Sequence, residues 1–280
     1  MPQLIVNADD LGRSTGINRG ILEAHQKGIV TSTSAMVNYP AAEHGIALLL
    51  EQAPFMGIGL HLTLTSGRPV CDPAEVPTLV DDDGRFYPPA ALAPVTMRWA
   101  AEEVERELRA QFARFQALVG RLPDHLDSHH GATYIFPAAL RVMLSLAREY
   151  NLPIRRGEYG ERALDTAKDW LLASLPPMQA RAVAEEVHGI LTQYRDVRYP
   201  DRMVSSFYDR RAILGELLTI LTTLPPAGVT ELMCHPGYAD GLDSPYNVQR
   251  EQELKWLTYP ATHEVVVAEG IRLMTFAELR

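Results

Sequence analysis

The sequence contains few cysteines and no long apolar run, and each absence excludes a class of protein. Cys71 and Cys234 are the only cysteines in 280 residues, which argues against a disulfide-stabilised scaffold and favours a reducing compartment. No apolar run approaches membrane-spanning length, and the first residues lack the basic and apolar regions of a signal peptide. We therefore expect a soluble cytoplasmic protein without a membrane partner.

Basic residues are scattered rather than clustered. The formal net charge is −9, and the only adjacent arginine pairs are Arg155-Arg156 and Arg210-Arg211. No basic stripe is present, so we expect no nucleic-acid partner. The sequence also lacks a phosphate-binding glycine loop and a G-x-S-x-G elbow, which argues against nucleotide chemistry and serine hydrolysis.

Strand and helix patterns alternate along the chain. Seven or eight strand–helix units predict an α/β fold with a parallel sheet. Their number and the chain length predict that the sheet is closed or nearly closed into a (β/α) barrel. Because the composition does not change along the chain, we expect residues 1–280 to form one domain. A doubly wound open sheet is the alternative. The expected strands are 4–7, 31–38, 58–64, 124–128, 153–156, 203–207, 228–234 and 271–274. The expected helices are 14–28, 40–50, 97–118, 137–150, 163–195, 209–222, 245–257 and 275–279.

One long segment, at about residues 66–96, is rich in Pro, Asp and Gly and has no clear periodicity. A connection of this length inside a domain is usually a functional loop rather than a linker. We expect it to close over a bound substrate.

Two adjacent carboxylates, Asp9 and Asp10, end the first expected strand. The structural alternative is a helix-capping Asp with a solvated neighbour. Paired carboxylates are costly to hold together unless a cation or a proton compensates them. If both side chains turn toward one cavity, they predict a metal site or an acid–base pair.

Histidines occur at or near the ends of three other expected strands. His61 lies within strand 58–64, His125 and Asp127 lie in the run His125-Leu126-Asp127-Ser128-His129-His130, and His235 follows strand 228–234. A single strand histidine is more often a core residue than a ligand. In parallel α/β folds, however, the carboxyl ends of the strands meet at one edge, where active sites form.

These residues suggest a division of roles. Asp10, His61 and His125 form a mixed N/O donor set for a divalent metal. Asp9 would take a proton from a metal-bound water, and His235 would give a proton to a leaving group.

The motifs resemble those of the YdjC-type carbohydrate deacetylases, the group that includes chitooligosaccharide deacetylase. The match extends over nearly the whole chain, through the runs 7–12, 18–38, 59–65, 125–130, 231–237, 250–254 and 275–279. The resemblance implies a (β/α) barrel related to polysaccharide deacetylases and a tendency toward homodimers. It also implies a divalent metal, usually Mg²⁺ although Zn²⁺ or another divalent ion is an alternative, on Asp10, His61 and His125, with Asp9 as the general base and His235 as the general acid.

The resemblance implies a small carbohydrate substrate, an N-acetylated amino sugar or a short chito-oligosaccharide, which is hydrolysed to acetate and a free amine. Asp127 and His129 are expected to orient the metal ligands, and Tyr134 and Tyr238 to stack on sugar rings. One departure is that Gly131-Ala132 follows His130 where family members often have further histidines, which leaves the identity of the sugar open.

Two other classes of function remain as alternatives. A metal-dependent sugar isomerase or aldolase would use a similar metal site, but none of Lys27, Lys168 and Lys255 adjoins a strand-end motif. A non-catalytic sugar-binding protein would need neither Asp9 nor His235.

Overall fold

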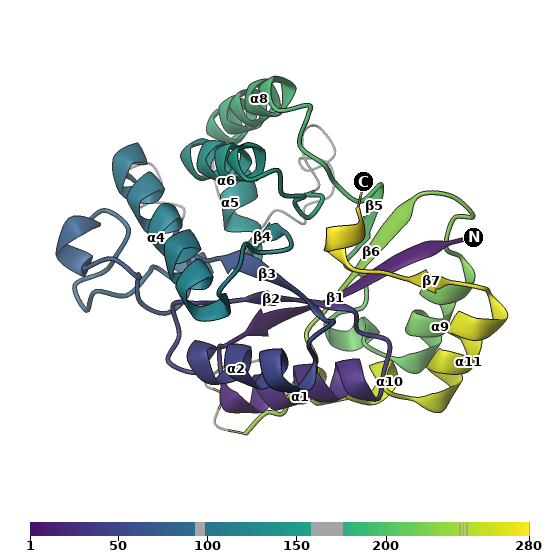
Figure 1. Ribbon diagram of the computed structural model, residues 1–280. Coiled ribbons are helices and arrows are strands. Elements are labelled where there is room, and N and C mark those ends of the chain that lie inside the picture. The colour runs from purple at the N-terminus through teal and green to yellow at the C-terminus, as the bar shows by residue number, and fades with distance from the viewer. Residues whose placement is uncertain (93–98, 158–175, 241, 243, 245, 280) are drawn as a thin grey trace.

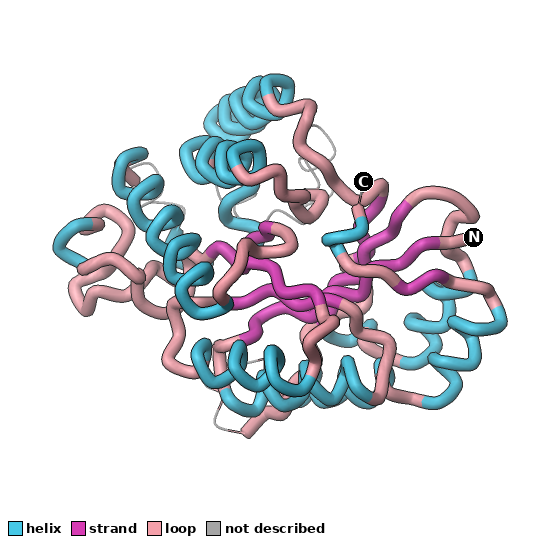
Figure 2. The backbone as a smooth tube through the Cα atoms, in the orientation of Figure 1, coloured by secondary structure: helices cyan, strands magenta, loops and turns pink. Residues whose placement is uncertain are grey.

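A single parallel sheet forms the centre of the computed structural model, which describes all residues except 93–98, 158–175, 241, 243, 245 and 280 (Figure 2). The strands lie in the order β4-β3-β2-β1-β6-β5, and β7 also pairs with β1. Every pairing is parallel. The bounds are β1 Gln3–Leu11, β2 Ser32–Ala35, β3 Gly57–Leu62, β4 Leu126–Ser128, β5 Arg202–Val204, β6 Val229–Cys234 and β7 Arg272–Leu273.

Helices cover the sheet on the sides that carry apolar residues. Below the sheet in Figure 1 lie α1, α2 and α10, and above β3 and β4 lie α4, α5, α6 and α8. The bounds are α1 Thr15–Gln26, α2 Ala42–Gln52, α4 Ala101–Val119, α5 Ala132–Ile135, α6 Pro137–Glu149, α8 Pro177–Gln193, α9 Leu214–Thr222, α10 Val248–Leu257 and α11 Pro260–Ala268. As predicted, Ser14 caps α1 by accepting a hydrogen bond from the Ile17 N–H.

The parallel α/β prediction is confirmed, but the regular sheet is open and the prediction of a closed barrel of seven or eight units is not met. The seam lies between β4 and β5, where residues 153–155 contribute one isolated bridge, Leu126 to Ile154. A single backbone hydrogen bond, from the Ile154 N–H to the Arg198 carbonyl, continues toward β5. Pro153 and Pro200 flank this seam and lack the N–H donors that continuous pairing requires.

Most expected elements occur with shorter or shifted bounds. The expected strand 153–156 is reduced to the bridge at Ile154, and α11 was not predicted. The expected helices 97–118, 163–195 and 245–257 begin at residues outside the described ones, and their described parts are α4, α8 and α10.

The two faces of β1 differ in chemistry, and this difference positions the functional residues. Leu4, Val6 and Ala8 are fully buried in the main hydrophobic core. The alternate residues Asn7 and Asp9 are equally buried but polar. Because successive side chains of a strand point to opposite faces, the polar residues gather on one face of the sheet.

The C-terminal segment covers this polar face at the end away from the carboxyl ends of the strands. Phe276 and Met274 are buried together with Ile5. Phe276 lies in a single helical turn, η7 (Phe276–Glu278), that a capping box of Thr275 and Glu278 stabilises. The polar face is therefore shielded from water on the side away from the carboxyl ends of the strands.

The long loop packs against α4 over the part that the structure describes. The buried Glu107 carboxylate accepts hydrogen bonds of 2.9 Å from the N–H groups of Val70 and Cys71. Glu103 accepts from the N–H and hydroxyl of Thr78. The expected role of this segment in closing over a substrate stays a prediction.

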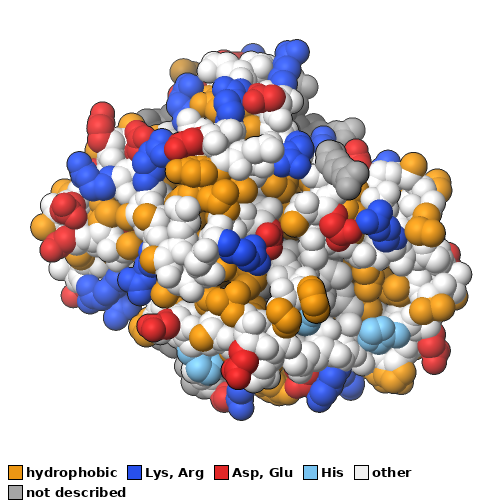
Figure 3. Space-filling model, viewed as in Figure 1, with side chains coloured by type: hydrophobic (Ala, Val, Ile, Leu, Met, Phe, Trp, Pro, Cys, Tyr) orange, Lys and Arg blue, Asp and Glu red, His pale blue; other side chains and the backbone are white. Residues whose placement is uncertain are grey.

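The molecular surface carries mixed charge. On the face shown in Figure 3, acidic and basic side chains are interspersed, with apolar side chains between them. Among the described residues, no helix combines the length and the apolar character needed to cross a membrane.

Candidate metal centre and active site

A β-bulge brings Asp9 and Asp10 to one site. In the β1–β2 register Ala8 pairs with Thr33 and Leu11 pairs with Ala35, so β1 contains one residue more than β2 between these pairs. Asp10 has φ of 75°, a left-handed conformation that non-glycine residues rarely adopt. The bulge cancels the alternation of the strand, and both carboxylates approach His61, whose Nε2 lies 3.5 Å from Asp10 Oδ1 and 4.0 Å from Asp9 Oδ2.

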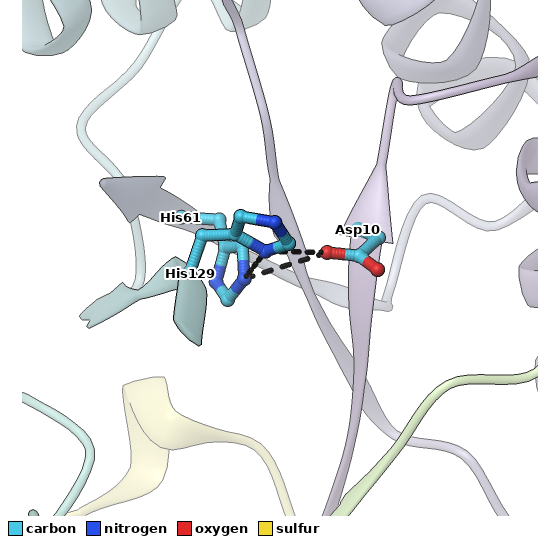
Figure 4. A group of neighbouring side chains, drawn as sticks. All are labelled: Asp10, His61 and His129. Atoms are coloured by element: carbon cyan, nitrogen blue, oxygen red, sulfur yellow. Dashed lines mark hydrogen bonds and ion pairs between the residues drawn. The ribbon is translucent and has the colours of Figure 1, made fainter. Parts of the chain in front are cut away.

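Three side chains from three places in the chain converge beside this bulge (Figure 4). Asp10 Oδ1 lies 3.1 Å from His129 Nδ1 and 3.5 Å from His61 Nε2. The two ring nitrogens are 3.3 Å apart. Donor atoms about 2.1 Å from one ion lie about 3.0 Å apart in octahedral and about 3.4 Å apart in tetrahedral geometry, so the three atoms have the spacing of a metal-binding group.

The protonation states in this group also fit a cation. His61 Nδ1 lies 2.7 Å from Asp127 Oδ1, which can only accept, so His61 presents the Nε2 lone pair to the group. Asp10 Oδ1 is buried and has no hydrogen-bond partner. Burial lowers the pKa of His61, but Asp127, Asp9 and Asp10 together raise it, which means that the carboxylates favour positive charge at this point.

The expected ligand His125 does not lie in this group. Its ring is fully buried and stacks on Phe276 with centroids 3.8 Å apart. The ring also lies directly over Gly59, where an added Cβ would fall 2.2 Å from a ring carbon. Gly59 precedes His61 by two residues on the same face of β3, so His125 occupies the layer below the ligand group.

His129 reaches the group because the chain turns sharply after β4. Residues His129–Gly131 form a short 3-10 turn in which His130 has φ of 55° and Gly131 has φ of 69°. The turn returns the His129 ring over the strand end. The sequence predicts that Asp127 and His129 orient the metal ligands. In the structure, His129 Nδ1 lies among the candidate donor atoms, and Asp127 contacts His61.

Asp9 is held by a buried arginine. Arg155 donates from both terminal nitrogens to the two oxygens of Asp9, at 2.6 and 2.7 Å. Asn7 Nδ2 donates a further bond of 2.9 Å. Burial raises the pKa of Asp9, but Arg155 and His61 outweigh it, so that the pKa lies below its ordinary value. Asp9 is therefore ionised at neutral pH and fixed in direction.

The same arginine joins two more buried acids. Arg155 Nε donates to Glu231 at 2.6 Å, and Nη2 lies 3.1 Å from Asp127 Oδ2. Asp9, His61 and Asp127 have metal-ligand spacing as well. The guanidinium already supplies a positive charge to both carboxylates of this second group, so we assign no metal to it.

Asp10 has separate partners for its two oxygens. Arg250, which is 2% exposed, donates from Nη2 to Oδ2. Arg13 Nη1 lies 3.6 Å from the same oxygen. Burial opposes ionisation, yet Arg250 and His129 hold the pKa of Asp10 well below its ordinary value. Oδ1 is thus left to face the two histidines as an anionic donor.

His235 borders the group on the β6 side. Its Nε2 lies 3.9 Å from Asp9 Oδ2, and its Nδ1 lies 3.9 Å from Glu253 Oε1. Glu253 on α10 also accepts hydrogen bonds from the His235 backbone N–H and the Tyr246 hydroxyl. Burial lowers the pKa of His235 to about 4, although Asp9 and Asp10 oppose this shift. The imidazole is therefore neutral at pH 7.

The two tyrosines expected to stack on sugar lie outside this immediate group. Tyr134 is buried in the hydrophobic core, and its hydroxyl donates to the Arg155 carbonyl at 3.2 Å. Tyr238 donates its hydroxyl to Glu23 on α1, and Arg19 lies over its ring. Both contacts tie elements of the fold together.

The family model of YdjC-like proteins matches residues 3–268. This chain belongs to the YdjC-like protein family.

Several relatives match this YdjC-like chain along nearly their whole length. The chain is 38% identical over 277 residues to a carbohydrate deacetylase of Geobacillus stearothermophilus, covering 98% of this chain and 96% of the relative. It is 34% identical over 280 residues to a chitooligosaccharide deacetylase of Serratia marcescens, covering 99% and 98%. A crystal structure of a protein from Enterococcus faecalis V583 superposes with a TM-score of 0.82 at 33% identity, covering 98% of this chain and 97% of that one.

Four charged residues at this YdjC-like site had no predicted role, namely Arg155, Glu231, Arg250 and Glu253. All four are buried. Glu231 gave a usable signal, because a charged residue inside an otherwise apolar strand is rarely fully buried without a partner. Arg155 gave a similar signal in the expected strand 153–156, but its three acidic partners are distant in sequence.

Proposed function

We propose that this protein is a metal-dependent hydrolase that removes the N-acetyl group from an N-acetylated amino sugar or a short chito-oligosaccharide. The main observation in support is that Asp10, His61 and His129 converge on one point. Two candidates for proton transfer, Asp9 and His235, lie beside this group. The names of the relatives support the same reaction class, since they are called carbohydrate and chitooligosaccharide deacetylases.

The proposed ligands of the divalent ion are Asp10 Oδ1, His61 Nε2 and His129 Nδ1. A divalent ion held there would polarise the acetyl oxygen and lower the pKa of a bound water. Mg²⁺ usually takes oxygen ligands, whereas imidazole suits ions such as Zn²⁺. The donor set therefore predicts tighter binding of Zn²⁺ than of Mg²⁺, which a titration with each ion measures.

Asp9 is the proposed general base. Its carboxylate is ionised, and Arg155 fixes both oxygens, so it accepts the proton of the attacking water without itself reorienting. Pairing with Arg155 makes Asp9 a weak base, which limits its role to a water whose own pKa is lowered.

His235 is the proposed proton donor to the departing amine. Because burial lowers its pKa to about 4, the ring is neutral before the reaction begins. Its Nε2 faces Asp9 Oδ2 at 3.9 Å, which is outside hydrogen-bond distance. The proton that Asp9 takes from the water passes to the imidazole when the two side chains approach, and from there to the amine nitrogen as the C–N bond breaks. The products are acetate and the free amino sugar.

Acetate release from N,N′-diacetylchitobiose tests this proposal. We expect release by the metal-loaded wild type and loss of it with a chelator. We expect Asp9→Asn and His235→Ala to lower the rate by about 10²- to 10⁴-fold while the metal remains bound. Wild-type rates in either variant would contradict the assigned roles, and no acetate from a panel of N-acetyl sugars would contradict the function.

The alternative functions make different predictions. An isomerase or aldolase would convert a sugar without releasing acetate, and a sugar-binding protein would bind without turnover. Lys27 lies on the surface, where it pairs with Glu23, and does not supply an amine to the site. The single domain, the homodimer, the cytoplasmic location and a lid function of the 66–96 loop remain predictions.

A further inference from the structure

We propose that the ring of Tyr208 is the platform on which the acetylated sugar stacks, directly beside the proton donor His235. Tyr208 follows β5 at the carboxyl edge of the sheet, where the site lies. Its side chain is 44% exposed, whereas the preceding Phe207 is fully buried. Phe207 thus anchors the backbone at the point where Tyr208 faces outward.

Among the residues that the structure describes, ring contacts cover only one face of Tyr208. Tyr208 stacks on Tyr246 with centroids 4.4 Å apart and an interplanar angle of 3°. The His235 ring lies 5.5 Å from Tyr208 and 5.8 Å from Tyr246, at 66° and 69° to them. Since His235 is almost equally distant from the two stacked rings, it lies beside the stack and not on its end. The Tyr208 face opposite Tyr246 is therefore free of both rings.

Hydrogen bonds to the Tyr246 hydroxyl fix the position of this pair of stacked rings. The Tyr246 hydroxyl donates to the buried Glu253, which also binds the His235 backbone N–H. The Asp209 N–H donates to the same hydroxyl at 3.0 Å. Asp209 has φ of 52°, and its carboxylate accepts a bond of 3.1 Å from Gln249 on α10. The carboxyl group of Glu253 therefore positions both the proton donor and the ring that supports Tyr208.

The chemistry of a pyranose ring fits this surface. The C–H groups of such a ring form an apolar face, which packs on an exposed aromatic ring while the hydroxyl groups remain in water. This inference rests on the proposed function, because the amine that His235 would protonate is a substituent of that sugar. The ring next to His235 is then the one that carries the acetamide, and Tyr208 selects a flat, equatorially substituted sugar.

Binding and turnover measured separately test the proposal. The variants are Tyr208→Ala and Tyr208→Leu, which remove the planar face, and Tyr208→Phe, which keeps it. Tyr259→Ala is the matched control, because Tyr259 is similarly exposed at 41% but packs edge-on against Trp256. Each variant is also made with Asp9→Asn, so that the dissociation constant of N,N′-diacetylchitobiose is measured by calorimetry without turnover.

Loss of one aromatic contact of about 1.4 kcal/mol predicts about tenfold weaker sugar binding. We expect this loss, and a matching rise in KM with kcat within about twofold, for Tyr208→Ala and Tyr208→Leu. Tyr208→Phe and Tyr259→Ala are expected to behave like their parent proteins. Unchanged sugar binding in Tyr208→Ala, or equally weak binding in Tyr208→Phe, overturns the platform. Binding without acetate release by the otherwise wild-type protein contradicts the proposed function but leaves this test intact.

Discussion

His61 donates the hydrogen of Nδ1 to Asp127 Oδ1 over 2.7 Å, and both side chains are shielded from water. The two residues pair directly in the register of β3 and β4. This bond fixes the tautomer of His61, so its Nε2 lone pair faces Asp10 and His129. The proposed metal-binding group therefore depends on the carboxylate of Asp127, which lies outside that group.

Replacing Asp127 by Asn is expected to weaken metal binding by about 10- to 100-fold. The Asn amide group can donate to Nδ1, which would move the hydrogen of His61 to Nε2 and block the donor. Competition with a chromophoric chelator measures the affinity. Asp124→Asn is the control, because Asp124 accepts a bond from the Ile58 N–H and does not touch His61. Equal affinity in the two variants would show that the tautomer does not depend on Asp127.

Replacing Arg155 by Met is expected to destabilise the fold by about 3–5 kcal/mol, because it leaves buried carboxylates without their cation. Asp9, Asp127 and Glu231 all lie within 3.1 Å of the guanidinium. Urea unfolding measures the loss. The exposed Arg148 pairs with Asp196 at the surface, so Arg148→Met is expected to change the midpoint little. Similar midpoints for the two variants would mean that the acids are neutralised by protons instead.

Glu253 is expected to make stability depend on pH. Burial raises its pKa from an ordinary 4.5 to about 8. Between these values the folded protein keeps a proton that the unfolded chain releases, so the stabilisation is complete below about pH 4.5 and is lost as the pH rises through 8. One pKa unit is worth about 1.4 kcal/mol, and each kcal/mol shifts Tm by about 2–4 °C.

Calorimetric scans from pH 5 to pH 9 check this expectation. The Tm of the wild type should fall by several degrees more than that of Glu253→Gln, which stays neutral throughout. Glu264→Gln, at an exposed position on α11, is the control and should follow the wild type. Parallel curves for the wild type and Glu253→Gln would contradict the raised pKa.

The strand-end residues could be predicted because their signals are local. An apolar run that ends in Asp9-Asp10 and a histidine inside the alternating strand around His61 both mark positions on the sheet. The parallel sheet itself follows from the alternation of strands and helices. The closure of that sheet did not follow, because it depends on the weak seam that Pro153 and Pro200 leave between β4 and β5.

The choice between His125 and His129 could not be read from the spacing. His125 and His129 flank the short strand β4 and are four residues apart. Along a strand, every second side chain lies on the same face, one layer further on, so the spacing alone does not say which ring lies in the layer of Asp10. The turn with positive φ at His130 and Gly131 determines which ring reaches Asp10. The Arg155 cluster was missed for a related reason, since its partners come from three separate strands.

Metal affinity in two matched variants tests the proposed ligand set most directly. His129→Phe and His125→Phe each keep a ring and remove its nitrogens, and titration with Zn²⁺ measures both. We predict that His129→Phe lowers the Zn²⁺ affinity by more than about 100-fold, which exceeds the usual effect of losing a residue that only orients a ligand. The Zn²⁺ affinity of His125→Phe should stay within a few-fold of the wild type. Strong loss in His125→Phe together with wild-type affinity in His129→Phe would contradict the ligand set of Asp10, His61 and His129.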